Sequence, residues 1–198
     1  LLAKAENSIY NSLSLSKVSE VEPELFGSGE AGANAFNIDS RNLDNRLDAS
    51  YHTPEVHTAI KQMEESEEDD LGKRVKLENL AESFVPPRFT RIYVDDPSDG
   101  VPMLQGSHVD QIEPQGLEYI WEEMDDLERY IIKEDMILVT CSGTVGDLCL
   151  VTDQQDGWAA TNHLIRVIPN EKVHSGYLTA FLMSEYGQVQ FERLTYGG

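Results

Sequence analysis

The sequence predicts an α+β domain in which short helices pack on a small, mostly antiparallel sheet, with a further helix at the N-terminus. Three observations support this fold class: short β-branched or apolar runs alternate with glycine turns, two amphipathic segments follow them, and another amphipathic segment opens the chain. The length of 198 residues, 40% of them hydrophobic, suits one well-buried core. We therefore expect one folded domain with a helical appendage.

Four runs of the second half of the chain have the composition of strands, which favours β-branched, aromatic and other apolar residues. They are residues 89–94, 136–139, 148–151 and 163–168. The second and third runs are separated by a tight turn that contains Gly143 and Gly146, and the fourth ends at Pro169. These features predict strands that are joined by short turns.

Two helices are predicted before the sheet. Apolar residues recur at three-to-four spacing in residues 1–15, so this segment resembles the end of an amphipathic helix that needs a partner. Thr53 can cap a second helix with its hydroxyl, and Pro54 suits the first helical position. This helix is expected to end at about Glu64, where an acidic run to Asp70 is interpreted as a flexible connector.

Two short helices that pack on the sheet are predicted at the C-terminal end. Their apolar faces consist of Tyr177, Ala180 and Phe181 and then of Val189, Phe191 and Leu194, with a break at Gly187. The expected organisation is a helix over residues 1–15, a linker over residues 16–72 with one helix and the acidic connector, and one domain over residues 73–198.

The charge of the chain restricts the partners that it can bind. A protein that holds nucleic acid must neutralise phosphates, so a net charge of −21 confines any such contact to a local patch. Cations gather in one segment only, as Lys73, Arg74, Lys76, Arg88 and Arg91. A source rich in salt is a second reason for so acidic a surface, because high net charge maintains solubility there.

The motifs that catalysis would need lack their structural setting. Gly27, Gly29 and Gly32 match a dinucleotide-binding pattern, but Pro23 and acidic residues stand where that pattern requires a buried strand. No lysine has a carboxylate two positions before it, as a common type of two-metal nuclease requires. Ser142 lacks the flanking glycines of a nucleophile elbow. We therefore expect a non-catalytic chain without a cofactor.

A metal site is not predicted either. His52 and His57 are five positions apart, which does not place them on one helix face, and no cysteine is close to a histidine in the sequence. Both histidines are expected at the surface. Cys141 and Cys149 lie on either side of a glycine turn in an apolar stretch and are expected to be buried free thiols.

The sequence also bears on location. No apolar run approaches the roughly 18 residues of a membrane span, and the first residues lack the basic-then-apolar layout of a signal peptide. A cytoplasmic protein without a membrane partner is therefore predicted. The absence of an initiator methionine suggests that Leu1 lies inside a longer natural chain.

Five sequence blocks follow one another in a specific order. They are residues 88–94 (RFTRIYV), 100–107 (GVPMLQGS), 133–146 (KEDMILVTCSGTVG), 157–169 (GWAATNHLIRVIP) and 177–188 (YLTAFLMSEYGQ). In this order and spacing they resemble the target recognition domain of type I restriction-modification specificity (S) subunits, over residues 77–198. Residues 46–51 resemble the start of such a domain, and residues 2–10 are similar to the end of the spacer helix before it.

The resemblance implies a DNA sequence-recognition module with no catalytic role. In that family each of two recognition domains reads one half of a bipartite target in double-stranded DNA, while partner methylation (M) and restriction (R) subunits carry out the chemistry. The chain is thus expected to be a specificity-subunit fragment. Two alternatives are the recognition domain of a single-chain restriction-methyltransferase and an acidic DNA-mimic anti-restriction protein. Mimicry leaves the five blocks unexplained, so DNA recognition is favoured.

Eight side chains are predicted to contact DNA: Arg88, Arg91, Gln105, Ser107, Ser142, Thr144, Asn162 and His163. The two arginines can reach phosphates or a guanine edge, or else form surface ion pairs with Asp95 or Asp96. The polar residues lie on tight loops or at a strand start, where they can approach base edges. Asn162 can pair bidentately with adenine or can cap the turn.

Overall fold

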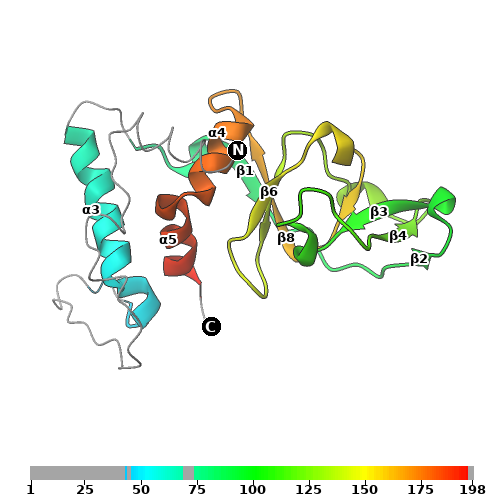
Figure 1. The fold of residues 1–198 in the computed structure, drawn as a ribbon, viewed down its shortest axis with the longest axis horizontal. Helices are drawn as coiled ribbons and strands as arrows, with labels where there is room; N and C mark the ends of the chain where they lie inside the picture. The colour runs from blue at the N-terminus through cyan, green and yellow to red at the C-terminus, as the bar shows by residue number, and fades with distance from the viewer. Residues whose placement is uncertain (1–42, 44–45, 69–73, 196–198) are drawn as a thin grey trace. The chain divides into compact units, whose positions relative to one another are not determined.

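The computed structural model describes residues 43, 46–68 and 74–195 (Figure 1). The predicted helix over residues 1–15, most of the linker and the glycine pattern over residues 27–32 lie outside these residues. Contacts divide the chain into two compact units, Val75–Thr179 and a second unit that joins Leu1–Arg74 to Ala180–Gly198. They are called the sheet unit and the helical unit. No helix among the described residues is long and apolar enough to cross a membrane.

The sheet unit contains two four-stranded sheets. Sheet A is antiparallel throughout, in the order β1 (Ala81–Phe84), β8 (Leu164–Pro169), β5 (Ile137–Thr140) and β6 (Leu148–Leu150). The strands predicted over residues 136–139, 148–151 and 163–168 are thus confirmed. Between β5 and β6, Gly143 and Gly146 have φ angles of 78° and 99°. Glycine adopts this left-handed backbone without a steric cost, so the turn depends on both.

Sheet B has the order β2 (Tyr93–Val94), β4 (Glu118–Trp121), β3 (Gly100–Leu104) and β7 (Ala159–Ala160). Only the pair β3 and β7 is parallel among the described strands, so the predicted α+β class with a mostly antiparallel sheet is confirmed. Short 3-10 helices lie in the connections: η3 (Leu77–Asn79), η4 (Pro97–Asp99), η5 (Gly106–His108), η6 (Leu127–Arg129) and η7 (Asp153–Gln155).

Of the strand predicted over residues 89–94, only β2 forms. The Phe89 ring stacks on Tyr130, with the ring centroids 3.7 Å apart. Before β2 the pairing with β4 reaches Ile92, whose carbonyl accepts a hydrogen bond of 2.8 Å from the Trp121 amide. The prediction for residues 89–92 is therefore wrong, because the packing of Phe89 outweighs the β propensity of the segment.

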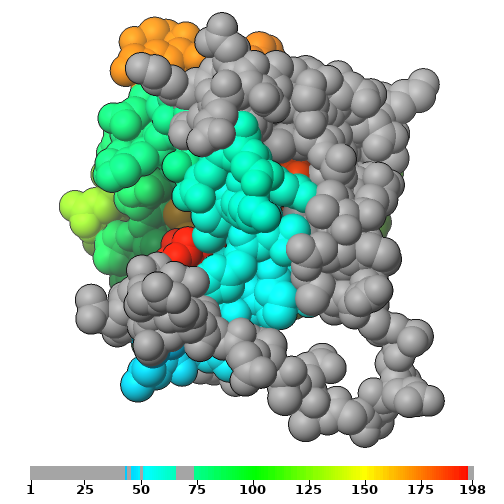
Figure 2. All heavy atoms as spheres, turned by 90° about the vertical axis from the view of Figure 1, so that its left-hand side faces the viewer, coloured from blue at the N-terminus to red at the C-terminus, as the bar shows by residue number. Residues whose placement is uncertain are grey.

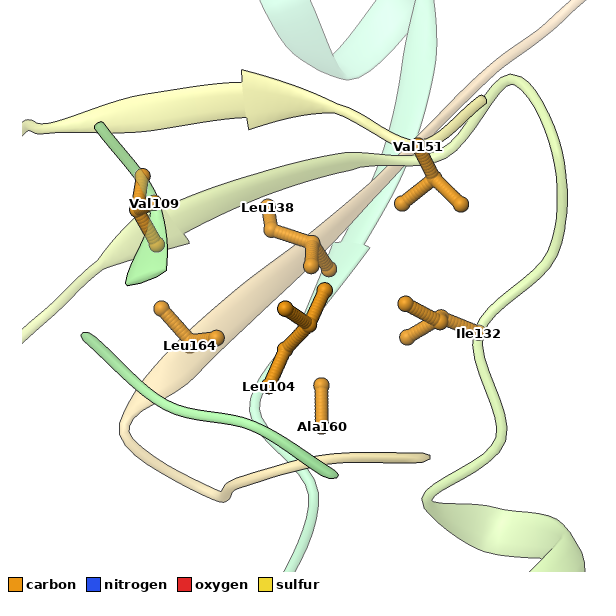
Figure 3. Packing of buried hydrophobic residues seen from close by; sticks show 7 residues of the cluster. All are labelled: Leu104, Val109, Ile132, Leu138, Val151, Ala160 and Leu164. Carbon is orange, nitrogen blue, oxygen red and sulfur yellow. The ribbon is translucent and has the colours of Figure 1, made fainter. Parts of the chain in front are cut away.

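The two sheets of this unit share a hydrophobic core. Figure 3 shows its side chains pointing toward one another from both sheets: Leu104, Val109, Ile132, Leu138, Val151, Ala160 and Leu164. A second cluster lies against one face of sheet B and comprises Met103, Ile120, Met124, Leu127, Tyr130 and Ala159. Burial of both apolar clusters holds the loops at the strand ends in place, since non-directional hydrophobic burial is the main favourable term in folding.

A charged side chain also lies in this core. Arg166 on β8 is 1% exposed, and its guanidinium donates hydrogen bonds to the backbone carbonyls of Ala160, Thr161 and Leu164, the one to Thr161 at 2.6 Å. No carboxylate pairs with Arg166 among the described residues. Burial lowers the pKa of Arg166 to about 10, so the group stays cationic at neutral pH.

The helical unit contains η2 (Ala49–His52), α3 (Pro54–Glu68) and α5 (Glu185–Leu194). The helix α3, the cyan ridge in Figure 2, packs on α5 through Val56, Ala59, Tyr186 and Val189. The predicted cap is confirmed, because the Thr53 hydroxyl accepts a hydrogen bond of 3.4 Å from the Val56 amide. The helix α4 (Ser175–Met183) crosses from the sheet unit into the helical unit. The two predicted C-terminal helices are therefore present, but the expectation that both pack on the sheet is wrong for α5, which packs on α3.

Two expectations for the helical unit are wrong. The acidic run does not begin a flexible connector at Glu64, because α3 continues to Glu68 and Lys61 lies 3.7 Å from Glu65 one helical turn later. His52 is not at the surface: it is 3% exposed, its Nε2 lies 2.8 Å from the Arg46 carbonyl, and its ring stacks on that of the half-buried His57. Both histidines are therefore packing residues.

The prediction of a helix break at Gly187 is wrong: the break occurs at Ser184, the N-cap of α5. Gly187 is buried in the first turn of α5, and a Cβ atom there would lie 2.5 Å from the carbonyl oxygens of both Phe181 and Leu182. The close approach of α4 and α5 at this corner therefore requires a residue without a side chain.

Replacement of Gly187 by alanine is expected to lower the free energy of unfolding by about 2 kcal/mol, since overpacking outweighs the gain in helix propensity. The matched control is Gly176→Ala in α4, where the added Cβ would contact only the His174 ring, at 3.4 Å. Urea unfolding monitored by circular dichroism measures both changes. Equal stability of the two variants would contradict the steric explanation.

Candidate nucleic-acid interface

Three loops of the sheet unit meet at neighbouring strand ends. They follow β3 (residues 105–108), β5 (residues 141–146) and β7 (residues 161–163). The Thr161 amide donates to the Leu104 carbonyl at 3.0 Å, and the Cys141 amide donates to the His163 carbonyl at 3.0 Å. The loop after β7 is therefore bonded to the ends of both other strands. Six of the eight predicted DNA-contact residues lie on these three loops: Gln105, Ser107, Ser142, Thr144, Asn162 and His163.

Ser142 and His163 form a direct side-chain contact. The Ser142 hydroxyl and the Nδ1 of His163 share a hydrogen bond of 2.9 Å, and both side chains are exposed. The Cys141 thiol adds a hydrogen bond of 3.1 Å to the His163 carbonyl. These bonds fix the imidazole through one nitrogen and leave its Nε2 edge directed away from Ser142. Such an edge can bond to a phosphate oxygen or to a base acceptor.

Arg91 is joined to the same loops through Asn162. Its Nη2 donates a hydrogen bond of 3.2 Å to Asn162 Oδ1, and its guanidinium carbon lies 5.5 Å from the centroid of the Phe89 ring. The ion pair with Asp95 or Asp96 that the sequence left open does not form among the described residues. The Asp96 carboxylate instead accepts hydrogen bonds from Ser98, which hold its pKa below the usual value.

The Arg91 contact changes the expected role of Asn162. Bidentate pairing with adenine uses both the oxygen and the nitrogen of the amide, and here the oxygen already accepts from Arg91. In this conformation Asn162 orients the guanidinium of Arg91. Arg91 retains further N–H donors for a phosphate or for the acceptor edge of guanine.

The remaining loop residues differ in their contacts. Gln105 Nε2 donates to a carboxylate oxygen of Glu118 on β4, and the Gln105 backbone amide donates to His108 Nδ1 at 3.1 Å. Ser107 and Thr144 are exposed, and Thr144 contributes its carbonyl as acceptor for the Thr140 hydroxyl. A polar surface of amides, hydroxyls and one imidazole therefore covers the three loop ends.

Arg88 is not brought to this surface by any hydrogen bond or ion pair in the described part of the chain, and its side chain is exposed. The predicted basic patch is also weaker than its composition suggests. Arg74 lies 3.6 Å from Glu64, Lys76 lies 3.4 Å from Glu78, and Lys73 lies outside the described residues. Arg88 and Arg91 are therefore the patch cations whose charge no described carboxylate offsets.

Glu118 was missed by the sequence prediction. The register of β3 and β4 places it opposite Met103, next to Gln105, and its exposed carboxylate can accept a hydrogen bond from the amino group of cytosine. No local signal identifies Glu118, because β4 itself was not predicted.

The described residues contain potential metal ligands and two cysteines. Among the described residues no group of three or more histidine, cysteine, aspartate or glutamate side chains could hold a metal ion. Cys141 and Cys149 are free, and both are partly buried. Burial raises the pKa of Cys149 to about 11, so this thiol is neutral at physiological pH.

No protein-family model matches the chain, and no curated protein matches its sequence. The HsdS subunit from Thermoanaerobacter tengcongensis is similar at 12% identity with a TM-score of 0.48, over 62% of this chain and 29% of that one. A second similar chain comes from a structure that concerns complex assembly and conformational transition of the type I R-M system. It has 12% identity and a TM-score of 0.49, over 72% of this chain and 40% of that one. The chain thus spans less than half the length of either. The first neighbour is an HsdS subunit and the second comes from a type I R-M system, and the likeness concerns the fold alone.

Proposed function

We propose that this chain is a DNA sequence-recognition module of a type I restriction-modification system. It reads one half of a bipartite target in double-stranded DNA, and methylation and restriction subunits act on the DNA that it selects. The observation that carries the proposal is the meeting of three polar loops at one edge of the sheet unit. Four polar side chains are hydrogen-bonded there in two pairs, Arg91 with Asn162 and Ser142 with His163.

The chemistry of this edge suits base reading more than catalysis. Amide and hydroxyl groups can donate and accept, which is what discrimination between base-pair edges in the major groove requires. Arg91 supplies the positive charge for a phosphate contact, and contacts of that kind position a protein without selecting sequence. Because Phe89 and Asn162 hold Arg91, less side-chain entropy is lost when it binds.

The same charge distribution implies weak binding by the chain alone. Few cations oppose a net charge of −21, so affinity for duplex DNA is expected to be low and to fall steeply with salt. In the assembled enzyme, partner subunits add their own phosphate contacts.

Replacement of Arg91 by alanine is expected to weaken binding to all duplex sequences alike. The slope of the logarithm of the association constant against the logarithm of salt concentration should fall by about one, as for one lost phosphate contact. Fluorescence anisotropy with a random duplex measures both quantities. Arg88→Ala should have a similar effect if this exposed side chain also holds a phosphate.

Arg129→Ala is the matched control, since Arg129 is an exposed arginine that lies 3.2 Å from Asp126 and is remote from the loops in the sequence. An equal loss of DNA affinity in Arg129→Ala would show that the effect of Arg91→Ala comes from the change in net charge and not from a phosphate contact. If the chain instead displaced DNA from a restriction complex without binding DNA itself, the proposal would fail in favour of DNA mimicry.

A further inference from the structure

One face of sheet B is apolar: it enters the shared core at Leu104, and its part over β2 and β4 is partly exposed. Ile92, Val94, Pro102, Tyr119 and Trp121 form this outer face. The register sets Tyr119 opposite both Val94 and Pro102, while Val101, Met103 and Ile120 enter the second core on the other face. A Cβ atom on Gly100 would lie 2.5 Å from Val94 Cγ2 and 3.1 Å from Tyr119 Cβ, which confirms that these two side chains share the face.

The outer face retains much of its exposure. Ile92 is 47% exposed and Trp121 is 37% exposed, and the other members are half-buried. Isolated surface hydrophobic residues are common, but contiguous apolar and aromatic side chains on one sheet face are typical of protein interfaces.

Carboxylates border this face at the ends of its strands. Asp95 and Asp96 follow β2, Asp99 precedes β3, and Glu122 and Glu123 follow β4; we call them the acidic rim. The Glu122 amide donates to the Asp99 carbonyl at 3.2 Å, so two of these segments are adjacent. All five side chains are exposed, and none of them is in an ion pair among the described residues.

The apolar outer face and the acidic rim together limit which kind of partner can bind there. DNA phosphates are repelled by the acidic rim, and so is the same rim on a second copy of the chain. A lysine- or arginine-rich segment with apolar side chains satisfies both features. Its cations meet the carboxylates, while its apolar groups and methylene stems cover the Trp121 and Tyr119 rings.

We propose that the outer face of sheet B and its acidic rim form a docking site for a cationic, partly apolar segment of a partner protein. The site shares no residue with the three polar loops and does not depend on the proposed reading of DNA. It assigns part of the acidity of the chain to a binding role.

The test measures the affinity of the whole chain for a labelled peptide of alternating lysine and leucine. Two control peptides replace lysine by glutamate or leucine by serine, and both should bind at least about tenfold more weakly. The Trp121→Ser variant is expected to lose about tenfold in affinity for the lysine-leucine peptide, because it removes the largest aromatic surface of the face.

A second variant changes only exposed carboxylates of the acidic rim and leaves the apolar side chains of the face in place. Three of the five rim residues are neutralised together as Asp99→Asn, Glu122→Gln and Glu123→Gln, which should weaken peptide binding about tenfold at low salt and hardly at about 1 M salt. The charge-matched control neutralises exposed acids at sheet A elements as Glu82→Gln, Asp153→Asn and Glu171→Gln, and it should leave binding nearly unchanged.

Equal weakening by the two triple variants would show general attraction to an acidic protein and would overturn the proposal. Unchanged binding by the rim variant, dimerisation of the chain through the face, or loss of duplex DNA binding in the rim variant would also overturn it. Because neither variant alters Arg91 or the three loops, failure here leaves the DNA-reading proposal to its own test.

Discussion

Replacing Arg166 with methionine is expected to lower the free energy of unfolding by about 2–4 kcal/mol. Methionine fills a similar volume, so the loss does not come from a cavity. It arises because the carbonyls of Ala160 and Leu164 lose their donor. The pairing of β1 with β8 extends only as far as Arg166, so the Leu164 carbonyl has no partner on β1.

Removal of the buried charge partly offsets this loss, since desolvation disfavours the guanidinium, as its lowered pKa shows. Buried unpaired acceptors cost about 1–3 kcal/mol each, and the two carbonyls of Ala160 and Leu164 together exceed that relief. The Thr161 carbonyl keeps the Leu164 amide as a donor at 3.3 Å. Chemical denaturation of the whole chain measures the change. Arg129→Met, at an exposed arginine, is the control and should alter stability by less than about 0.5 kcal/mol. A stability gain for Arg166→Met would show that the cost of burying the guanidinium charge exceeds the stabilisation by its hydrogen bonds.

Simultaneous replacement of Gln105, Ser107, Ser142, Thr144 and Asn162 by alanine is expected to abolish the preference of the assembled enzyme for the half of the target that this chain reads. A well-formed side-chain contact to a base edge discriminates by about 1–3 kcal/mol, so several lost contacts reduce specificity about a thousandfold or more. Affinity for random DNA should fall much less, because phosphate contacts supply most of it.

Mapping of methylation on random-sequence DNA measures this loss of preference directly. The control replaces Ser83 and Gln154, exposed polar residues of β1 and η7, by alanine and should preserve the recognised motif. An unchanged motif in the fivefold variant would place the reading surface on another face of the sheet unit. Thermal unfolding of both variants separates loss of reading from loss of fold.

Local chemistry explains which elements the sequence could predict. The helix α3 begins at Pro54 because Thr53 caps it, and β5 and β6 are apolar runs on either side of a turn with two left-handed glycines. Each of these signals lies within a few residues. The strands β1, β3, β4 and β7 gave no such signal, since they contain polar residues, proline or only two alanines.

The candidate site shows the same division between local and distant information. Polar residues on glycine loops could be selected from the sequence, and three loops of this kind do meet. Their partners could not be selected, because Arg91 and Asn162 are 71 residues apart and Ser142 and His163 are 21 apart. Glu118 reaches Gln105 only through the pairing of β3 with β4.

The sequence by itself determined the α+β class, the positions of the glycine turns, the capped start of α3 and the chemical types available on the loops. These depend on backbone preferences and periodicity, which act over a few residues. The tertiary structure alone decided that Arg166 is buried among carbonyls, that His52 packs inside the helical unit and that Asn162 engages Arg91. Burial and pairing are set by residues far away in the chain, and their energies exist only once the sheets and helices have packed.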